Sequence, residues 1–336
     1  MFCLNLLHSL CMRFRIGLIL TLLAAALPAV DSARADDPGG EGETPLITAL
    51  LTKQAEDDSE VAAPLWKYRD ARLQADVERA LGALGLARAA QTQQLALALV
   101  DSTDPDRPRV AAVNGDMMMY AASLPKIAIL LAAFEQAEQG RLRLDAEMEA
   151  SLTAMIRHSS NVDATAMIHR VGVENIARVL MSPRYRFYDP DHNGGLWVGK
   201  DYGKAGLWQR DPLHSLSHGA TPLQVARFYY LLERDELVSP AASRKMKTML
   251  GDTAINHKFA KGLRELDPQV ALWRKSGTWQ NFHSDSVLVE RNGYSYIAVA
   301  LSNDARGGDW LSQLIVKLDN IIAARPTKRF ETAGRR

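Results

Sequence analysis

The sequence predicts an α+β fold in which one antiparallel sheet is flanked by N- and C-terminal helices and a helical insertion forms a second lobe. Three observations lead to this prediction. Two β-like runs lie near the start of the folded region, three more lie near its end, and the segment between them is mainly helical. Strands from both ends of the chain would then share one sheet, and a cleft between the lobes is the expected place for a functional site.

The N-terminal residues are predicted to lie outside this fold. Two arginines precede an apolar run over 16–27, and the small-residue site Ala33-Arg34-Ala35 follows, which is typical of a secretory signal peptide over residues 1–35. The apolar run is shorter than the roughly 20 residues that span a bilayer, so we expect cleavage and no membrane anchor afterwards. Residues 36–63, rich in Asp, Glu, Gly and Pro, are expected to form a flexible leader.

The folded region is predicted over residues 64–326 as one domain, with 327–336 as a disordered basic tail. It begins with a helical segment over 71–90. The runs 95–100 and 110–113 are β-like and are joined by turn-forming residues, which indicates a hairpin.

The middle of the domain is predicted to be helical. The run 124–139 is apolar at helical spacing, ends at Gly140, and has Ser123 in the position of an N-cap. It is too apolar for a surface helix, so we expect it to be buried. Residues 141–180 continue as helix. Residues 182–219 show no period, and a loop of that length is usually functional.

The C-terminal part returns to strands. Thr221-Pro222 opens a helix that runs through 233. The runs 272–278, 286–289 and 294–301 are predicted strands, with the hairpin turn Asn292-Gly293 between the last two. A final amphipathic helix is expected over 310–324.

The composition excludes several classes of function. With 40 basic and 39 acidic residues the chain has no charge signature of nucleic-acid binding. Both cysteines, Cys3 and Cys11, fall in the predicted signal peptide, so no disulfide and no thiol nucleophile is expected in the mature protein. His214 and His218 stand four apart without a third ligand at a recognisable spacing, so no metal or organic cofactor is expected.

Three short motifs carry the candidate chemistry. Ser123-Leu124-Pro125-Lys126 places a hydroxyl and an amine three residues apart, on one face of a helix. Lys126 can act as the base for a serine nucleophile if burial or nearby positive charge lowers its pKa from about 10.4. The other two motifs are Ser159-Ser160-Asn161 and, on a predicted strand, Lys275-Ser276-Gly277-Thr278.

Each motif is the sole match to its pattern in the chain, and their fixed order makes the set far stronger than any member. The set resembles the Ser-x-x-Lys, Ser-Asp-Asn and Lys-Thr-Gly motifs of class A β-lactamases and penicillin-binding proteins. The resemblance extends over about 65–324. It implies the β-lactamase/transpeptidase-like fold and a serine hydrolase that works through an acyl-enzyme.

The resemblance also implies catalytic roles. Ser123 would be the acylated nucleophile, and Lys126 would take its proton. Ser159 would pass a proton to the departing nitrogen, and Lys275 would ease that transfer by its charge.

The binding roles are implied in the same way. Asn161 would bind the amide side chain of the substrate, and the backbone N–H groups of Ser123 and Thr278 would form the oxyanion hole. Gly277 would let the strand approach the ligand closely. The hydroxyls of Ser276 and Thr278, with Lys275, would hold the substrate carboxylate.

The chain departs from the class A pattern at the residue that activates the deacylating water. Class A enzymes use a glutamate in the loop after the second motif, but no glutamate occurs between Glu174 and Glu233. The candidate bases are Asp201 and Asp189, each one methylene shorter; both are also plausible loop-capping residues. Trp197, Tyr202 and Trp208 in this loop either line a ligand pocket or pin the loop.

Three functions remain open at this stage. The first is a periplasmic or secreted, monomeric β-lactamase that hydrolyses β-lactam amides and so confers antibiotic resistance. The second is a penicillin-binding D-Ala-D-Ala carboxypeptidase-like enzyme with slow deacylation, acting on a peptidoglycan stem peptide. The third is a non-catalytic cell-wall-binding module.

Overall fold

The computed structural model describes residues 63–203 and 209–324. The predicted signal peptide, nearly all of the leader, Trp208 and the basic tail lie outside the described residues. No helix in the described part of the chain is long and apolar enough to cross a membrane.

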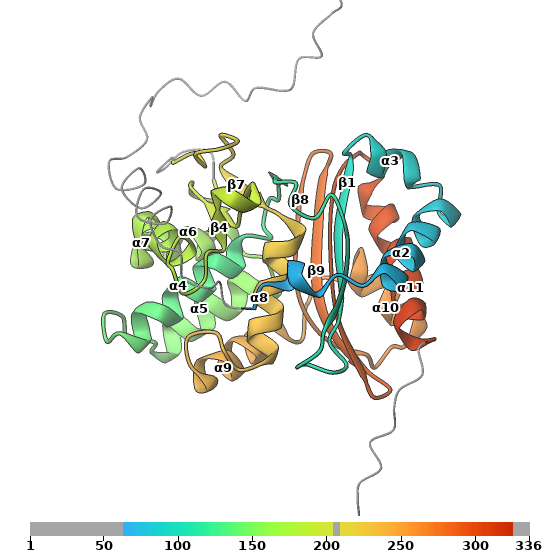
Figure 1. Cartoon of the computed structure of the whole chain (residues 1–336). Helices are drawn as coiled ribbons and strands as arrows, with labels where there is room; N and C mark the ends of the chain where they lie inside the picture. Colours follow the sequence, from blue (N-terminus) through green and yellow to red (C-terminus); the bar gives the residue numbers. More distant parts are fainter. Residues whose placement is uncertain (1–62, 204–208, 325–336) are drawn as a thin grey trace, which may run out of the picture. The chain divides into compact units, whose positions relative to one another are not determined.

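A five-stranded antiparallel sheet combines strands from both ends of the chain, as the sequence predicted (Figure 1). The strand order is β2-β1-β10-β9-β8. In the register of the central pair, Leu95 lies opposite Ser302 and Asp101 lies opposite Tyr296. The strands are β1 (Leu95–Asp101), β2 (Arg109–Val113), β8 (Ala271–Trp279), β9 (Phe282–Arg291) and β10 (Tyr294–Asn303).

The two faces of this sheet bury different sets of side chains. Along β1, Leu95, Leu97 and Leu99 belong to one apolar core, whereas Ala96 and Ala98 belong to the other. This is the two-residue period of a strand that is covered on both faces. The larger side chains face the helices near the chain ends, namely α2 (Ala71–Ala83), α3 (Ala87–Gln91), α10 (Phe259–Leu266) and α11 (Gly307–Ala323).

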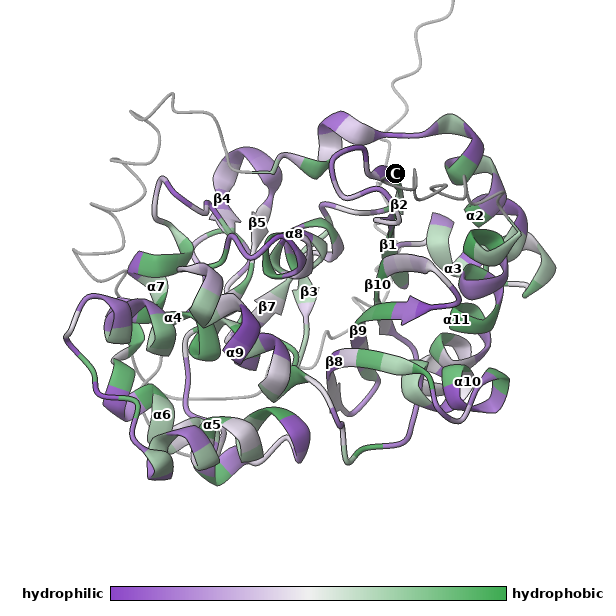
Figure 2. Ribbon diagram, turned by 90° about the horizontal axis from the view of Figure 1, so that it is seen from below, coloured by the Kyte–Doolittle hydropathy of each residue, from purple (hydrophilic) through white to green (hydrophobic). Residues whose placement is uncertain are grey.

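The helical lobe covers the other face of the sheet, and Figure 2 shows both groups of helices on opposite sides of the strands. At its centre α4 (Lys126–Glu138) is buried from Lys126 through Gln136, as its apolar sequence predicted. Helix α8 (Pro222–Glu233) packs on β1 and β10. It begins as predicted, because the Thr221 side chain accepts a hydrogen bond from the Gln224 N–H. The remaining helices of the lobe are α5 (Ala146–Arg157), α6 (Asn161–Val171), α7 (Val173–Leu180) and α9 (Pro240–Leu250).

The turn between β9 and β10 is the predicted Asn292-Gly293 hairpin. Both residues have positive φ, +50° and +81°, and Arg291 pairs with Tyr294 across it. That backbone is the two-residue turn that Asn-Gly favours.

Three local predictions were wrong. The helix expected over 71–90 is two helices, separated at Gly85 with φ +70°. Ser123 is not an N-cap, because α4 begins at Lys126 after Pro125 and Ser123 lies in the preceding turn. The stretch 182–219 is not only loop, since it contains four short strands: β4 (Tyr188–Asp189), β5 (Gly194–Gly195), β6 (Trp197–Val198) and β7 (His218–Ala220).

Candidate active site

The turn that carries Ser123 is tied to both lobes. It follows β3 (Met119–Tyr120), which pairs with β7. The Ala121 N–H donates to the His218 carbonyl at 2.9 Å, and the Ser284 hydroxyl on β9 donates to the Ala121 carbonyl at 2.7 Å. Ala122 has φ +50°, a conformation that side chains rarely adopt and that persists where the surroundings enforce it. The position of the candidate nucleophile is therefore fixed by contacts on both sides.

The edge strand β8 approaches this turn at Gly277. A Cβ atom on Gly277 would lie 2.2 Å from the Ala121 carbonyl oxygen and 2.6 Å from the Ser123 nitrogen. Only glycine permits this approach of the strand to the Ser123 turn. The backbone of the third motif and the backbone of Ser123 thus lie in contact.

Lys126 joins the first motif to the second. Its side chain is buried, and its Nζ donates to the Ser159 carbonyl at 2.7 Å, to the Ser160 carbonyl at 3.2 Å and to Asn161 Oδ1 at 2.8 Å. Burial lowers the pKa of Lys126 to about 7, although the nearby charge of Asp163 opposes the shift. A lysine in this state is available as a base near neutral pH.

Ser159 joins the second motif to the third. Lys275 Nζ donates to Ser159 Oγ at 2.9 Å and to the Ser276 carbonyl at 2.7 Å. Burial, and then the positive charge of Lys126, hold the pKa of Lys275 well below its usual range. Ser159 itself has φ +55°, an uncommon conformation for serine of the kind that clusters at functional sites.

The structure therefore brings the three motifs together, with two lysines converging on the second motif. Among the described residues, none makes a hydrogen bond with the Ser123 hydroxyl. The hydroxyls of Ser276 and Thr278 lie on the same strand as Lys275, at the edge of the sheet.

Sequence reasoning missed two basic residues that approach this strand from the loop before α10. His257 Nε2 lies 3.3 Å from Ser276 Oγ, and Lys258 Nζ donates to Thr278 Oγ1 at 2.7 Å. Burial lowers the pKa of His257 to about 4, and neighbouring positive charges add to this. No local pattern marks either residue, because each contacts a strand that lies beyond α10, 19 or 20 positions along the chain.

The aromatic residue Tyr202 was left open between a pocket wall and a loop anchor. Its ring centroid lies 4.4 Å from Lys126 Nζ, and its hydroxyl donates to the Ala122 carbonyl at 3.3 Å. Tyr202 therefore lines the site next to the lysine. Trp197 is buried against Tyr188, so it packs within the loop.

The two candidate deacylation bases differ in their surroundings. Asp189 is almost fully buried, accepts from Arg186 Nη2 at 3.1 Å and caps a short 3₁₀ helix, as a structural carboxylate does. Asp201 is next to Tyr202, and its Oδ2 lies 2.8 Å from His169 Nε2. Its Oδ1 is buried and has no hydrogen-bond partner within the described part of the chain. Asp189 Oδ2 is paired with Arg186 Nε at 3.0 Å, whereas Asp201 Oδ1 has neither a hydrogen bond nor an ion pair among residues 63–203 and 209–324.

The two histidines four apart do not converge. His218 Nε2 contacts the Lys200 carbonyl at 3.0 Å, whereas His214 Nε2 contacts the Asn193 carbonyl at 3.2 Å. Residues 63–203 and 209–324 hold no group of three or more His, Cys, Asp or Glu that could bind a metal.

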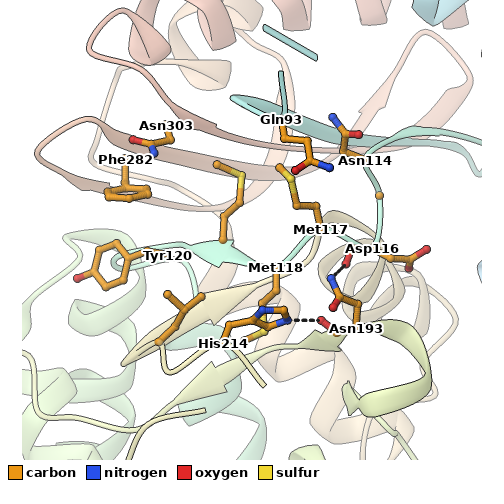
Figure 3. Close-up of a pocket in the computed structure, with 13 residues that line it drawn as sticks. Gln93, Asn114, Asp116, Met117, Met118, Tyr120, Asn193, His214, Phe282 and Asn303 are labelled. Carbon is orange, nitrogen blue, oxygen red and sulfur yellow. Dashed lines mark hydrogen bonds between the residues drawn. The ribbon is translucent and has the colours of Figure 1, made fainter. Parts of the chain in front are cut away.

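A pocket of about 730 Å³ is lined in part by residues 114–120, which precede the Ser123 turn in the sequence. Figure 3 shows Tyr120 and Phe282 at one end of this pocket and Asn114 and Asp116 at the other. The rings of Tyr120 and Phe282 meet edge to face, with centroids 5.4 Å apart. The motif residues do not line this pocket, so it adjoins the candidate site without being part of it.

Comparisons with known proteins show the family and the fold of the chain. The family model described as the beta-lactamase enzyme family matches residues 76–151 and 149–325. A beta-lactamase from Sphaerobacter thermophilus superposes with a TM-score of 0.58 at 16% identity, over 75% of this chain and 99% of that one. The structure of PBP-A has a TM-score of 0.57 at 17% identity, over 76% and 97%.

A mutant of PBP-A, solved as an acyl-enzyme complex with penicillin G, has a TM-score of 0.56 at 17% identity, over 76% of this chain and 97% of that one. At these identities the structural likeness shows the fold alone. No curated protein matches the sequence.

Proposed function

Because the chain belongs to the beta-lactamase enzyme family, we propose that it is an exported serine hydrolase that opens β-lactam amides through an acyl-serine at Ser123. The observation that carries the proposal is the convergence of two buried lysines on the second motif. Lys126 donates to Asn161 and to the Ser159 carbonyl, and Lys275 donates to the Ser159 hydroxyl. We place the mature protein in the periplasm or outside the cell.

In the first step Ser123 Oγ attacks the lactam carbonyl carbon, and its proton passes to Lys126. A neutral amine is required, and the lowered pKa of Lys126 supplies one near neutral pH. The developing oxyanion would accept from the backbone N–H groups of Ser123 and Thr278. The close approach of Gly277 to Ser123 supports this pairing of donors.

In the second step the carbon–nitrogen bond breaks, and the nitrogen takes the hydroxyl proton of Ser159. The hydrogen bond from Lys275 stabilises the negative charge that builds up on Ser159 Oγ. The proton held by Lys126 then restores the Ser159 hydroxyl, so that both side chains end as they began.

The remaining motif groups would hold the substrate. Asn161 Oδ1 already accepts from Lys126, which leaves the Nδ2 hydrogens free for an acceptor on the substrate amide. The hydroxyls of Ser276 and Thr278, with Lys275, would bind the carboxylate. The substrate in this proposal is a small anionic β-lactam, and no metal or organic cofactor takes part.

Hydrolysis of the acyl-enzyme needs a base for water, and we assign this role to Asp201. Its buried Oδ1 lacks a partner within the described residues, and its neighbour Tyr202 contacts Lys126. Asp189 is less suitable because its carboxylate is already paired with Arg186.

A D-Ala-D-Ala carboxypeptidase-like activity with slow deacylation is the second candidate. One observation favours it. No glutamate occurs between Glu174 and Glu233, so the residue that activates the deacylating water in class A enzymes has no equivalent there. Both candidates share the acylation half-reaction and differ only afterwards.

The deciding experiment is intact-protein mass spectrometry of the mature chain with benzylpenicillin, run in parallel with a hydrolysis assay. A short-lived adduct with rapid loss of drug supports the β-lactamase, whereas a lasting adduct with little hydrolysis supports the peptidase-like enzyme. The control is Ser123→Ala, which should give no adduct. Absence of any adduct on the wild-type protein would contradict both candidate activities. The remaining alternative would then be the non-catalytic cell-wall-binding module.

A further inference from the structure

Lys258 is a buried cation that the proposed mechanism does not use. It is 3% exposed and stands directly before α10. Its Nζ donates to the Gly277 carbonyl at 2.5 Å, to Thr278 Oγ1 at 2.7 Å and to the Ser284 carbonyl at 3.2 Å. The three hydrogens of the ammonium are therefore all directed at the strands next to Ser123.

We propose that Lys258 is a positioning residue that polarises the peptide between Gly277 and Thr278 and so strengthens the Thr278 N–H as an oxyanion donor. The inference deepens the proposed function and rests on it. Lys258 would act through the strand and would not touch the substrate.

The physical argument begins with the peptide bond. The carbonyl of Gly277 and the N–H of Thr278 belong to one conjugated amide. A cation bound to the carbonyl oxygen draws electron density from the nitrogen, which makes the N–H more acidic and a stronger donor. Hydrogen bonds in such a chain strengthen one another, and the effect is larger at a buried site of low dielectric.

A second consequence concerns the Thr278 side chain. A lysine ammonium has only donors, so Thr278 Oγ1 must accept from Lys258. The hydroxyl proton of Thr278 then points away from Lys258. Since Thr278 is exposed, that proton is available to a ligand carboxylate.

The loop that carries Lys258 is held by a buried ion pair. Arg274 Nη2 lies 2.7 Å from Asp285 Oδ2 and also donates to the His257 carbonyl at 3.0 Å. Asp285 Oδ2 accepts from the Phe259 N–H at 3.0 Å. The residues on either side of Lys258 are thus fixed to β8 and β9, which holds Lys258 at φ +51°.

The charge of Lys258 is retained near neutral pH. Burial lowers the pKa of Lys258 to about 8. The charge of Arg274 also lowers this pKa, whereas the charge of Asp285 raises it. Below that pH the ammonium polarises the peptide, and above it the effect is lost. The other titratable and charged groups that face Lys258 are Asp285, Arg274, His257, Lys275 and His283.

The first test needs no substrate. The ¹⁵N shift of an amide responds to a hydrogen bond at the preceding carbonyl, so the Thr278 amide of the mature protein should titrate with a midpoint near pH 8. In Lys258→Met this step should be absent, while Lys258→Arg should keep the low-pH shift across the range. The inference is overturned if the ¹⁵N shift of Thr278 shows no step near pH 8 and is unchanged by Lys258→Met. This holds whether or not the protein reacts with β-lactams.

The second test uses the acyl-enzyme with benzylpenicillin. We expect Lys258→Met to slow acylation about tenfold, less than the loss of a whole oxyanion donor, which costs about 10²- to 10³-fold. The acyl carbonyl stretch should move to higher frequency, and Lys258→Arg should restore both. The control is Lys247→Met, which removes another partly buried lysine, one that pairs with Glu233 and Glu290 away from the motifs.

The two failures can be told apart. An unchanged acylation rate and carbonyl stretch in Lys258→Met contradict the inference while leaving the proposed function intact. A wild-type protein that is never acylated contradicts the proposed function, and the Thr278 titration still decides whether Lys258 polarises the peptide.

Discussion

The ammonium of Lys275 lies 2.9 Å from the hydroxyl oxygen of Ser159, although 116 positions separate the two residues in the chain. Lys275 lies on the edge strand of the sheet, and Ser159 lies in the helical lobe just before α6. The contact joins the two lobes at the site, so a change in their packing would change the geometry of proton transfer.

Removing the Ser159 hydroxyl should slow acylation more than it affects stability. In Ser159→Ala we expect acylation by benzylpenicillin to fall about 10²- to 10⁴-fold, the range of a lost general acid or base. The rate of adduct formation measures this. The matched control is Ser239→Ala, whose side chain caps α9 by accepting from the Ala242 N–H, away from the three motifs. It should cost about 1 kcal/mol of stability and leave acylation unchanged.

The pH dependence of acylation should follow Lys126. Its pKa is lowered to about 7, and only the neutral amine can take the Ser123 proton. The acylation rate constant should therefore rise with pH through about 7 and fall again above about 8, where Lys258 loses its charge, as a pH series of adduct formation would show. Lys126→Arg stays charged and should be slow throughout. A flat wild-type profile between pH 5.5 and about 8.5, well to either side of that pKa, would argue against Lys126 as the base.

Gly277→Ala should disrupt the contact between β8 and the Ser123 turn. The new Cβ would lie 2.2 Å from the Ala121 oxygen, and backbone must move to relieve this. We expect a loss of about 1–3 kcal/mol of stability and about 10²- to 10³-fold slower acylation as the oxyanion donors separate. Thermal unfolding and adduct formation report the two effects.

Gly293→Ala is the control for that variant. Gly293 has φ +81°, but a Cβ atom added there would meet nothing within 4 Å, so only backbone strain of about 1 kcal/mol is expected. Equal acylation defects in the two variants would show that the effect at Gly277 is not local.

Asp201→Asn should prolong the acyl-enzyme without slowing its formation. Loss of a general base for water predicts an adduct lifetime about 10²-fold longer, measured by mass spectrometry after dilution from drug. Asp189→Asn is the comparison, because it weakens the buried pair with Arg186 and should lower stability by about 3 kcal/mol with no specific effect on adduct lifetime. The opposite pattern would transfer the role to Asp189.

The sequence predicted the sheet and the convergence of motifs better than the local details. The β-like run 95–100 and the Asn292-Gly293 turn are short-range signals, and both were confirmed. The start of α4 was misplaced, although Pro125 disfavours helix at the residue before it and so indicated a later start. The hydrogen bonds from Lys126 to the second motif were also not predicted, because they depend on tertiary packing.

Two helices were missed for different reasons. Helix α9 carries the readable start Ser239-Pro240, with Ser239 accepting from the Ala242 N–H. Helix α10 is short and contains Gly262, which weakens a helical pattern. Its glycine is explained only by packing, because a Cβ there would lie 2.3 Å from the Ser312 carbonyl oxygen on α11. His257 and Lys258 precede this helix, so their place beside β8 was equally hidden.

The gathering of buried basic side chains gives a nearly neutral protein a local electrostatic attraction for anions. Lys126, Lys258 and Arg274 all lower the pKa of Lys275, and the carboxylates that act on the three lysines are Asp163 and Asp285. Positive potential in a cleft speeds the encounter with an anionic ligand and is screened by dissolved ions. The rate at which penicillin binds should therefore fall as ionic strength rises. Phosphate ions should compete with penicillin for the same region of positive potential.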